Sequence, residues 1–200
     1  MSVQPWSAFD EGYLRAYQWA GALAGGTPMP QEPTTIPLGP GEVANALFAS
    51  VSVAGYFGED TQYRPSFLLV GGPVGLAVTG AASLAHNASK KAEARQAAVP
   101  RWHTLGAADL LVTNQRLVAT GNGHGESLWY AGAGPLQIAV GDGGTPAVQV
   151  QAPGHPPLRL ETAWAAMLYV FVHYHVDGRA PGVPMPPGLL ERARAEGRLR

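Results

Sequence analysis

Residues 108–120, ADLLVTNQRLVAT, decide the fold that this sequence predicts. Two short apolar segments, Ala108–Val112 and Arg116–Ala119, flank the polar tripeptide Thr113-Asn114-Gln115. Apolar runs that are separated by a few turn-forming residues are typical of a β-hairpin. The sequence therefore predicts an antiparallel hairpin here, and the neighbouring segments must be arranged around it.

Alternating apolar and polar residues on both sides of the hairpin predict further strands. Upstream, Val43–Val53 alternates, and we expect Leu47, Ala49, Val51 and Val53 to lie on one face of a half-buried strand. Short strands at spacings of about ten residues, with turn residues between them, are typical of an antiparallel barrel or sandwich. The downstream candidates are residues 127–131, 136–140, 148–151 and 158–160.

We expect one apolar helix, Ala163–His175, to close this framework, with Thr162 as its N-cap. Its core stripe, at positions i, i+3, i+4 and i+7, consists of Trp164, Met167, Leu168 and Phe171. The opposite side is also mostly apolar, so more than one face should be covered. A strand is an alternative for the second half, Tyr169–Val176, which is rich in β-branched and aromatic residues. Asp177-Gly178 should end the element.

The N-terminal part predicts a second helix. Ser7 with an acid three residues later, Asp10, is typical of a capped helix start. The apolar side chains that follow at helical spacing are Phe9, Tyr13, Leu14, Tyr17 and Trp19. Glycines within the helix weaken its propensity, so we expect it to be stabilised by docking through these side chains. The expected divisions are an N-terminal helix in 1–24, a proline-rich linker in 25–41, a main domain in 42–178 with a helical insertion at 66–99, and a proline-rich tail with a short helix in 179–200.

The insertion contains Phe67–Ala85, nineteen uncharged residues rich in alanine and glycine. A buried or surface-docked helix running from Val74 into the polar stretch that follows is the preferred interpretation. The alternative is a membrane-inserted or membrane-lying helix, since Lys90, Lys91 and Arg95 follow it as headgroup-binding cations would.

Composition excludes several classes of function. The net charge is −1, and no basic footprint for nucleic acid is visible. The absence of cysteine excludes disulfides, thiolate metal sites and a cysteine nucleophile. His173 and His175 diverge on a helix, so we expect structural roles for them and no metal site. No spacing indicates a catalytic set or a cofactor, and we expect a protein that is not an enzyme. No secretory signal is visible, so a cytoplasmic location is expected, with the inner face of the membrane as an alternative.

The hairpin resembles the l-x-v-T-n-x-R-l segment of bacterial pleckstrin-homology (PH)-like and GRAM-like domains. The matching residues are Leu110, Val112, Thr113, Asn114, Arg116 and Leu117. Gly41-Glu42 and Pro100-Arg101-Trp102 are similar to features of a group of actinobacterial proteins that share this hairpin. The resemblance implies an α+β fold, namely a PH-like antiparallel β-barrel capped by a C-terminal helix. It also implies a module that binds proteins, peptides or membranes.

The candidate binding residues are the cations Lys90, Lys91, Arg95, Arg101 and Arg116. Arg116 is the only lysine or arginine between Trp102 and Leu158, whereas a phosphoinositide site needs several converging cations. The sequence therefore predicts a non-catalytic binding or scaffolding module for a protein or peptide, with self-association possible. The alternative is a membrane-associated protein anchored by 67–85.

Overall fold

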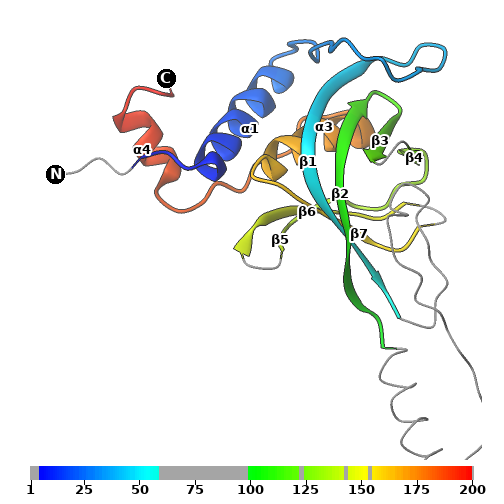
Figure 1. The fold of residues 1–200 in the computed structure, drawn as a ribbon. Helices are drawn as coiled ribbons and strands as arrows, with labels where there is room; N and C mark the ends of the chain where they lie inside the picture. Colours follow the sequence, from blue (N-terminus) through cyan, green and yellow to red (C-terminus); the bar gives the residue numbers. More distant parts are fainter. Residues whose placement is uncertain (1–4, 59–98, 122–123, 142–143, 153–154, 200) are drawn as a thin grey trace, which may run out of the picture.

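The structure, a computed structural model, describes residues 5–58, 99–121, 124–141, 144–152 and 155–199. Within these residues it is an α+β fold with one antiparallel sheet in the order β4-β3-β2-β1-β7-β6-β5 (Figure 1). The strands are β1 Ala44–Phe57, β2 Arg101–Thr113, β3 Arg116–Gly121, β4 His124–Trp129, β5 Gln137–Val140, β6 Pro146–Val150 and β7 Leu158–Glu161. The helices are α1 Ala8–Ala24, α3 Ala165–Asp177 and α4 Leu189–Ala195.

The predicted hairpin is confirmed as β2 and β3. Leu110 faces Ala119 and Val112 faces Leu117 across it, and Asn114 and Gln115 form the connection. The downstream strands are confirmed as well, and the first strand pairs with the last, β7. β4 and β5 lie at the two edges of the sheet, and no pairing joins them within the described residues. Closure into a barrel therefore stays a prediction.

The predicted set of buried residues is wrong for the first half of β1. Val51 and Val53 are buried as predicted, but Leu47 is 60 % exposed and Ala49 is exposed too. The reason is a bulge: the register with β2 shifts between Phe48 and Val51, which inserts an extra residue and reverses the alternation. Phe48 therefore faces the core in place of its neighbours.

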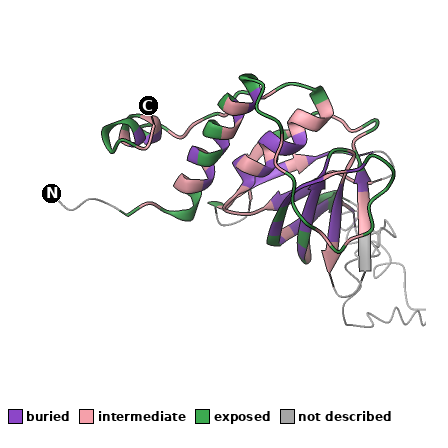
Figure 2. Cartoon of the chain, turned by 90° about the horizontal axis from the view of Figure 1, so that it is seen from above, coloured by how far each residue is buried: buried purple, intermediate pink, exposed green. Residues whose placement is uncertain are grey.

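α3 covers one face of the sheet and α1 covers α3, so the core lies between layers (Figure 2). Burial on several sides of α3 is confirmed, since Leu168, Val170 and Phe171 are all at most 1 % exposed. Tyr169–Val176 is helical, so the strand alternative is wrong. The helix begins at Ala165 without a side-chain cap, two residues later than predicted, and Gly178 ends it in a left-handed conformation.

The Ser7–Asp10 capping box of α1 is confirmed in both directions. The predicted docking side is wrong in part, because Phe9 and Tyr17 are 40 % and 38 % exposed. Leu14 is buried as predicted, and Tyr13 and Trp19 pack against the core, where the Trp19 ring contacts Phe171 of α3. The buried residues of α1 that were not predicted are small ones and one leucine, namely Gly12, Ala16, Ala20 and Leu23. Small residues let two helices approach closely, and a sequence pattern read by hydrophobicity alone overlooks them.

The proline-rich segment lies against the sheet, and we refer to residues 28–43 as the strap. As predicted, it contains no helix or strand. The Asn45 side-chain amide donates to the Pro30 carbonyl (2.6 Å), and the Glu32 amide donates to the Ala44 carbonyl (2.9 Å). Ile36 packs on the sheet face that is turned away from α3, over Ala44, Leu111 and Val118. The strap therefore crosses the outer face of β1, β2 and β3.

The predicted C-terminal helix is confirmed as α4, which packs against α1. No helix in the described ranges is long and apolar enough to cross a bilayer. The segment Phe67–Ala85 and most of the insertion at 66–99 lie outside those ranges.

Candidate binding groove

The predicted binding cations are not brought together by the described structure. Lys90, Lys91 and Arg95 lie outside the described residues. Arg101 begins β2 opposite Phe57, whereas Arg116 begins β3 at the other end of the β2–β3 hairpin.

Arg116 is occupied by contacts within the chain. Its Nε and one terminal nitrogen donate to both carboxylate oxygens of Glu42 (2.7 and 3.0 Å). The other terminal nitrogen donates to the Ser127 hydroxyl (2.7 Å), and a further bond reaches the Pro37 carbonyl (3.2 Å). The guanidinium lies 4.9 Å from the ring centre of Trp129. Through these contacts Arg116 attaches the strap to β3 and β4.

The neighbouring turn residues have the same role. The Asn114 side chain accepts from the Val43 amide (2.8 Å) and donates to the Gly41 carbonyl (3.0 Å). The buried Thr113 hydroxyl accepts from the amides of Gln115 and Arg116 and so shapes the turn. The Thr113–Arg116 turn is therefore bonded to Gly41-Glu42 of the strap, and we refer to these residues together as the clasp.

Glu42 is the buried charge of this clasp, with a side chain that has no exposed surface. Hydrogen bonds from Arg116 lower the pKa of Glu42 to about 2, against the opposing effect of burial. A backbone bond from the Gly39 amide (2.7 Å) favours the same ionised form. Glu42 is therefore negatively charged at neutral pH.

A groove of about 440 Å³ opens between the strap and the outer face of the sheet. Strap residues 33–36 form one wall, and the rest of its lining is Leu47, Asp109, Leu111 and Thr120. A hollow of about 160 Å³ adjoins it at the β1 bulge and shares Asp109 and Thr120 with it. The volume of the larger groove, about 440 Å³, is within the range of ligand pockets in proteins.

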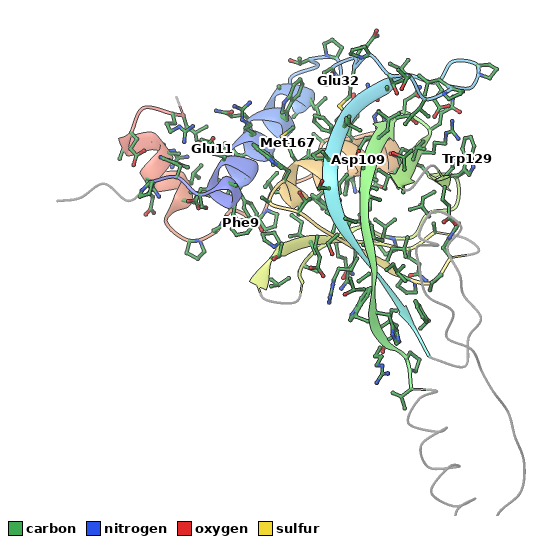
Figure 3. All side chains as sticks on the ribbon, viewed as in Figure 1. Phe9, Glu11, Glu32, Asp109, Trp129 and Met167 are labelled. Atoms are coloured by element: carbon green, nitrogen blue, oxygen red, sulfur yellow. The ribbon has the colours of Figure 1, made fainter. Side chains whose placement is uncertain are left out.

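Asp109 lies where the two hollows meet, on β2 (Figure 3). Its Oδ1 accepts from the amide of Ser50 (2.8 Å), the residue that adopts φ +54° in the bulge. One hydrogen bond uses only part of the accepting capacity of a carboxylate. Asp109 is exposed in the lining of both hollows, and no ion pair joins it to another of the described residues.

The histidines of the described residues do not form a metal site. No group of three or more histidine or acidic side chains among them could hold a metal ion. His175 is half-buried and stacks on Tyr130, and desolvation lowers the pKa of His175 to about 4. Burial raises the pKa of Tyr130. His173 contacts Asp177 at 3.0 Å on the same helix. His175 and Tyr130 are therefore ring contacts of the core, and His173 and Asp177 form an i, i+4 pair on α3.

The groove residues were not among the sequence candidates, which were all cations. The bulge exposes Leu47, and no pattern in β1 indicates a bulge at Ser50. Asp109 carried one signal, since it is the only charged residue in the apolar run from Leu105 to Val112. A charge within an otherwise apolar strand is a reason to look for a special environment.

Comparison of the chain with protein-family models, curated proteins and solved structures finds no match.

Proposed function

We propose that the protein is a non-catalytic, PH-like binding module that recognises a peptide segment of a protein partner. Two features support the PH-like part of the proposal. Strands β1–β4 and β5–β7 form two antiparallel meanders that are joined by the pairing of β1 with β7, and a C-terminal helix packs on one face. The hairpin carries the Thr-Asn-x-Arg turn on which the resemblance rests.

The groove under the strap is the observation that carries the binding role. The aliphatic side chain of Leu47, on the central strand β1, is 60 % exposed in the lining of this groove, and concave sites lined by apolar groups beside a few polar ones are typical of ligand binding. The clasp of Arg116 and Glu42 fixes the strap at one end of this groove. A fixed wall beside an exposed aliphatic floor is a preformed site, and preformed sites lose little conformational entropy on binding.

The test is a random peptide library displayed on phage and panned against the full chain, with affinities of enriched peptides measured by fluorescence anisotropy. We expect peptides to be enriched, and Leu47→Ser to weaken them about tenfold or more. Val140→Ser is the matched control, because Val140 is 69 % exposed on edge strand β5 and lies outside the groove lining.

Two results would contradict the proposal. One is that no peptide is enriched over wells without protein. The other has two parts: Leu47→Ser leaves every peptide affinity unchanged, and the chain sediments with vesicles of phosphatidylcholine and phosphatidylserine. That result would favour a membrane-binding role.

A further inference from the structure

We infer that the groove takes an extended peptide in which a lysine or arginine lies close to an aliphatic residue, and that Asp109 is the specificity-determining residue. This inference rests on the proposed function and names its ligand class. Its three parts are the charge, the apolar floor and the extended shape.

The charge follows from the groove lining. Among the described residues that line the two hollows, Asp109 is the one acidic side chain, and none is a lysine or arginine. Its carboxylate is held in place by the Ser50 amide and keeps further acceptor sites free for an incoming donor. A cationic side chain is the complementary partner, because it satisfies those sites and neutralises the charge.

The apolar part follows from the floor and one wall. Leu47 is 60 % exposed in the groove, its cross-strand neighbour Leu111 is 1 % exposed, and Ile36 packs on Leu111 from the strap. These aliphatic groups favour an aliphatic side chain on the ligand, which would cover Leu47. The hydroxyl groups of Thr34, Thr35 and Thr120 provide a polar margin.

The extended shape follows from the arrangement of the two hollows. They adjoin one another along the sheet and share Asp109 and Thr120. Side chains that lie on the same side of an extended peptide recur at roughly 7 Å. Such a peptide can place a cation at Asp109 and an aliphatic side chain at Leu47 without leaving the groove.

The experiment uses the peptides enriched on the wild-type chain and compares two variants of Asp109. Asp109→Asn keeps an oxygen for the Ser50 amide but removes the charge, and we expect it to weaken the peptides about tenfold. Asp109→Lys, panned anew, should enrich acidic peptides in place of basic ones. Glu191→Gln in α4 is the matched control, since it removes an exposed negative charge far from the groove lining.

The outcomes separate the inference from the proposed function. The ligand class is wrong if the enriched peptides lack lysine and arginine. It is also wrong if they bind Asp109→Asn as tightly as the wild-type chain. In either case the binding module stands, provided that Leu47→Ser still abolishes binding. If no peptide is enriched at all, both fall. Urea unfolding of each variant shows whether a loss of affinity reflects a loss of structure.

Discussion

At the scale of single residues, the pair of Glu42 and Arg116 controls the attachment of the strap. Glu42→Gln would give the mostly buried guanidinium a neutral partner, since the Arg116 side chain is 16 % exposed and that of Glu42 has no exposed surface. We expect the free energy of unfolding to fall by about 2–3 kcal/mol and the amides of the strap to exchange faster. Urea unfolding and hydrogen exchange measure the two effects.

Glu32→Gln is the control for that variant. Glu32 lies on the same strap but is exposed, and it binds the sheet through its backbone amide (Figure 3). An equal loss of stability in both variants would show that the ion pair has no special role.

Two glycines of α1 make a matched pair. A methyl group at Gly12 would overlap the Ala163 carbonyl, whereas one at Gly21 would meet no atom within 4 Å. We expect Gly21→Ala to raise the free energy of unfolding by about 0.5–1 kcal/mol through helix propensity. Gly12→Ala should lower it by roughly 1–3 kcal/mol, because α1 must move away from α3. Thermal unfolding distinguishes them, and a stabilised Gly12→Ala would refute the close approach.

At the scale of elements, the β1 bulge stores backbone strain. Ser50 has φ +54°, a left-handed conformation that costs a residue with a side chain roughly 1 kcal/mol. Ser50→Gly should therefore leave stability unchanged or raise it by up to about 1 kcal/mol, whereas Ser52→Gly, in the regular part of the strand, should lower it. Equal losses in urea unfolding would contradict the assignment of the bulge.

The two ends of the chain are joined by contacts between α1 and α4 (Figure 1). The guanidinium groups of Arg192 and Arg198 lie 4.4 and 4.2 Å from the ring centre of Trp6, whose indole nitrogen donates to Glu196. Arg198 also forms an ion pair with Glu11 (2.7 Å). This cluster of contacts holds a tail that has few buried side chains of its own.

Trp6→Ala should free the tail without unfolding the domain. We expect trypsin to cleave after Arg192 or Arg194 several times faster, while the free energy of unfolding of the whole chain changes by less than about 1 kcal/mol. Mass spectrometry of a limited digest gives the rates. Trp129→Ala, which removes an exposed tryptophan from the far edge of the sheet, should leave tail cleavage unchanged.

At the scale of the whole molecule, acid should destabilise the fold in two steps. Burial lowers the pKa of His175 from 6.5 to about 4, so between these values the unfolded chain binds a proton that the folded chain does not. The free energy of unfolding should fall from pH 6.5 to pH 4, by up to about 3 kcal/mol. His175→Phe should flatten this part of the stability profile.

The second step belongs to Glu42, whose folded pKa of about 2 lies below the ordinary value of 4.5. Its contribution is complete above pH 4.5 and is lost as the pH falls towards 2, and Glu42→Gln should remove that step alone. A profile in which both variants retain both steps would assign the acid sensitivity to other groups.

The sequence by itself determined the elements whose signal is local. The Thr113–Arg116 turn, the Ser7 capping box, the apolar α3 and the short downstream strands follow from side-chain periodicity and hydrogen bonding between near neighbours. These forces act over a few residues, so a pattern of a few residues is enough to predict them.

Only the tertiary structure decided which faces are covered. The bulge at Ser50 reversed which side chains of the first half of β1 are buried, and small residues bring α1 close to its neighbours. The strap is hydrogen-bonded to a turn that lies more than 70 residues away in the chain. Each outcome depends on contacts between segments that are remote in the chain, for which a single sequence carries no periodic signal. The groove at Asp109 exists because the bulge and the strap meet on the outer face of the sheet, so its residues could be identified only in the folded molecule.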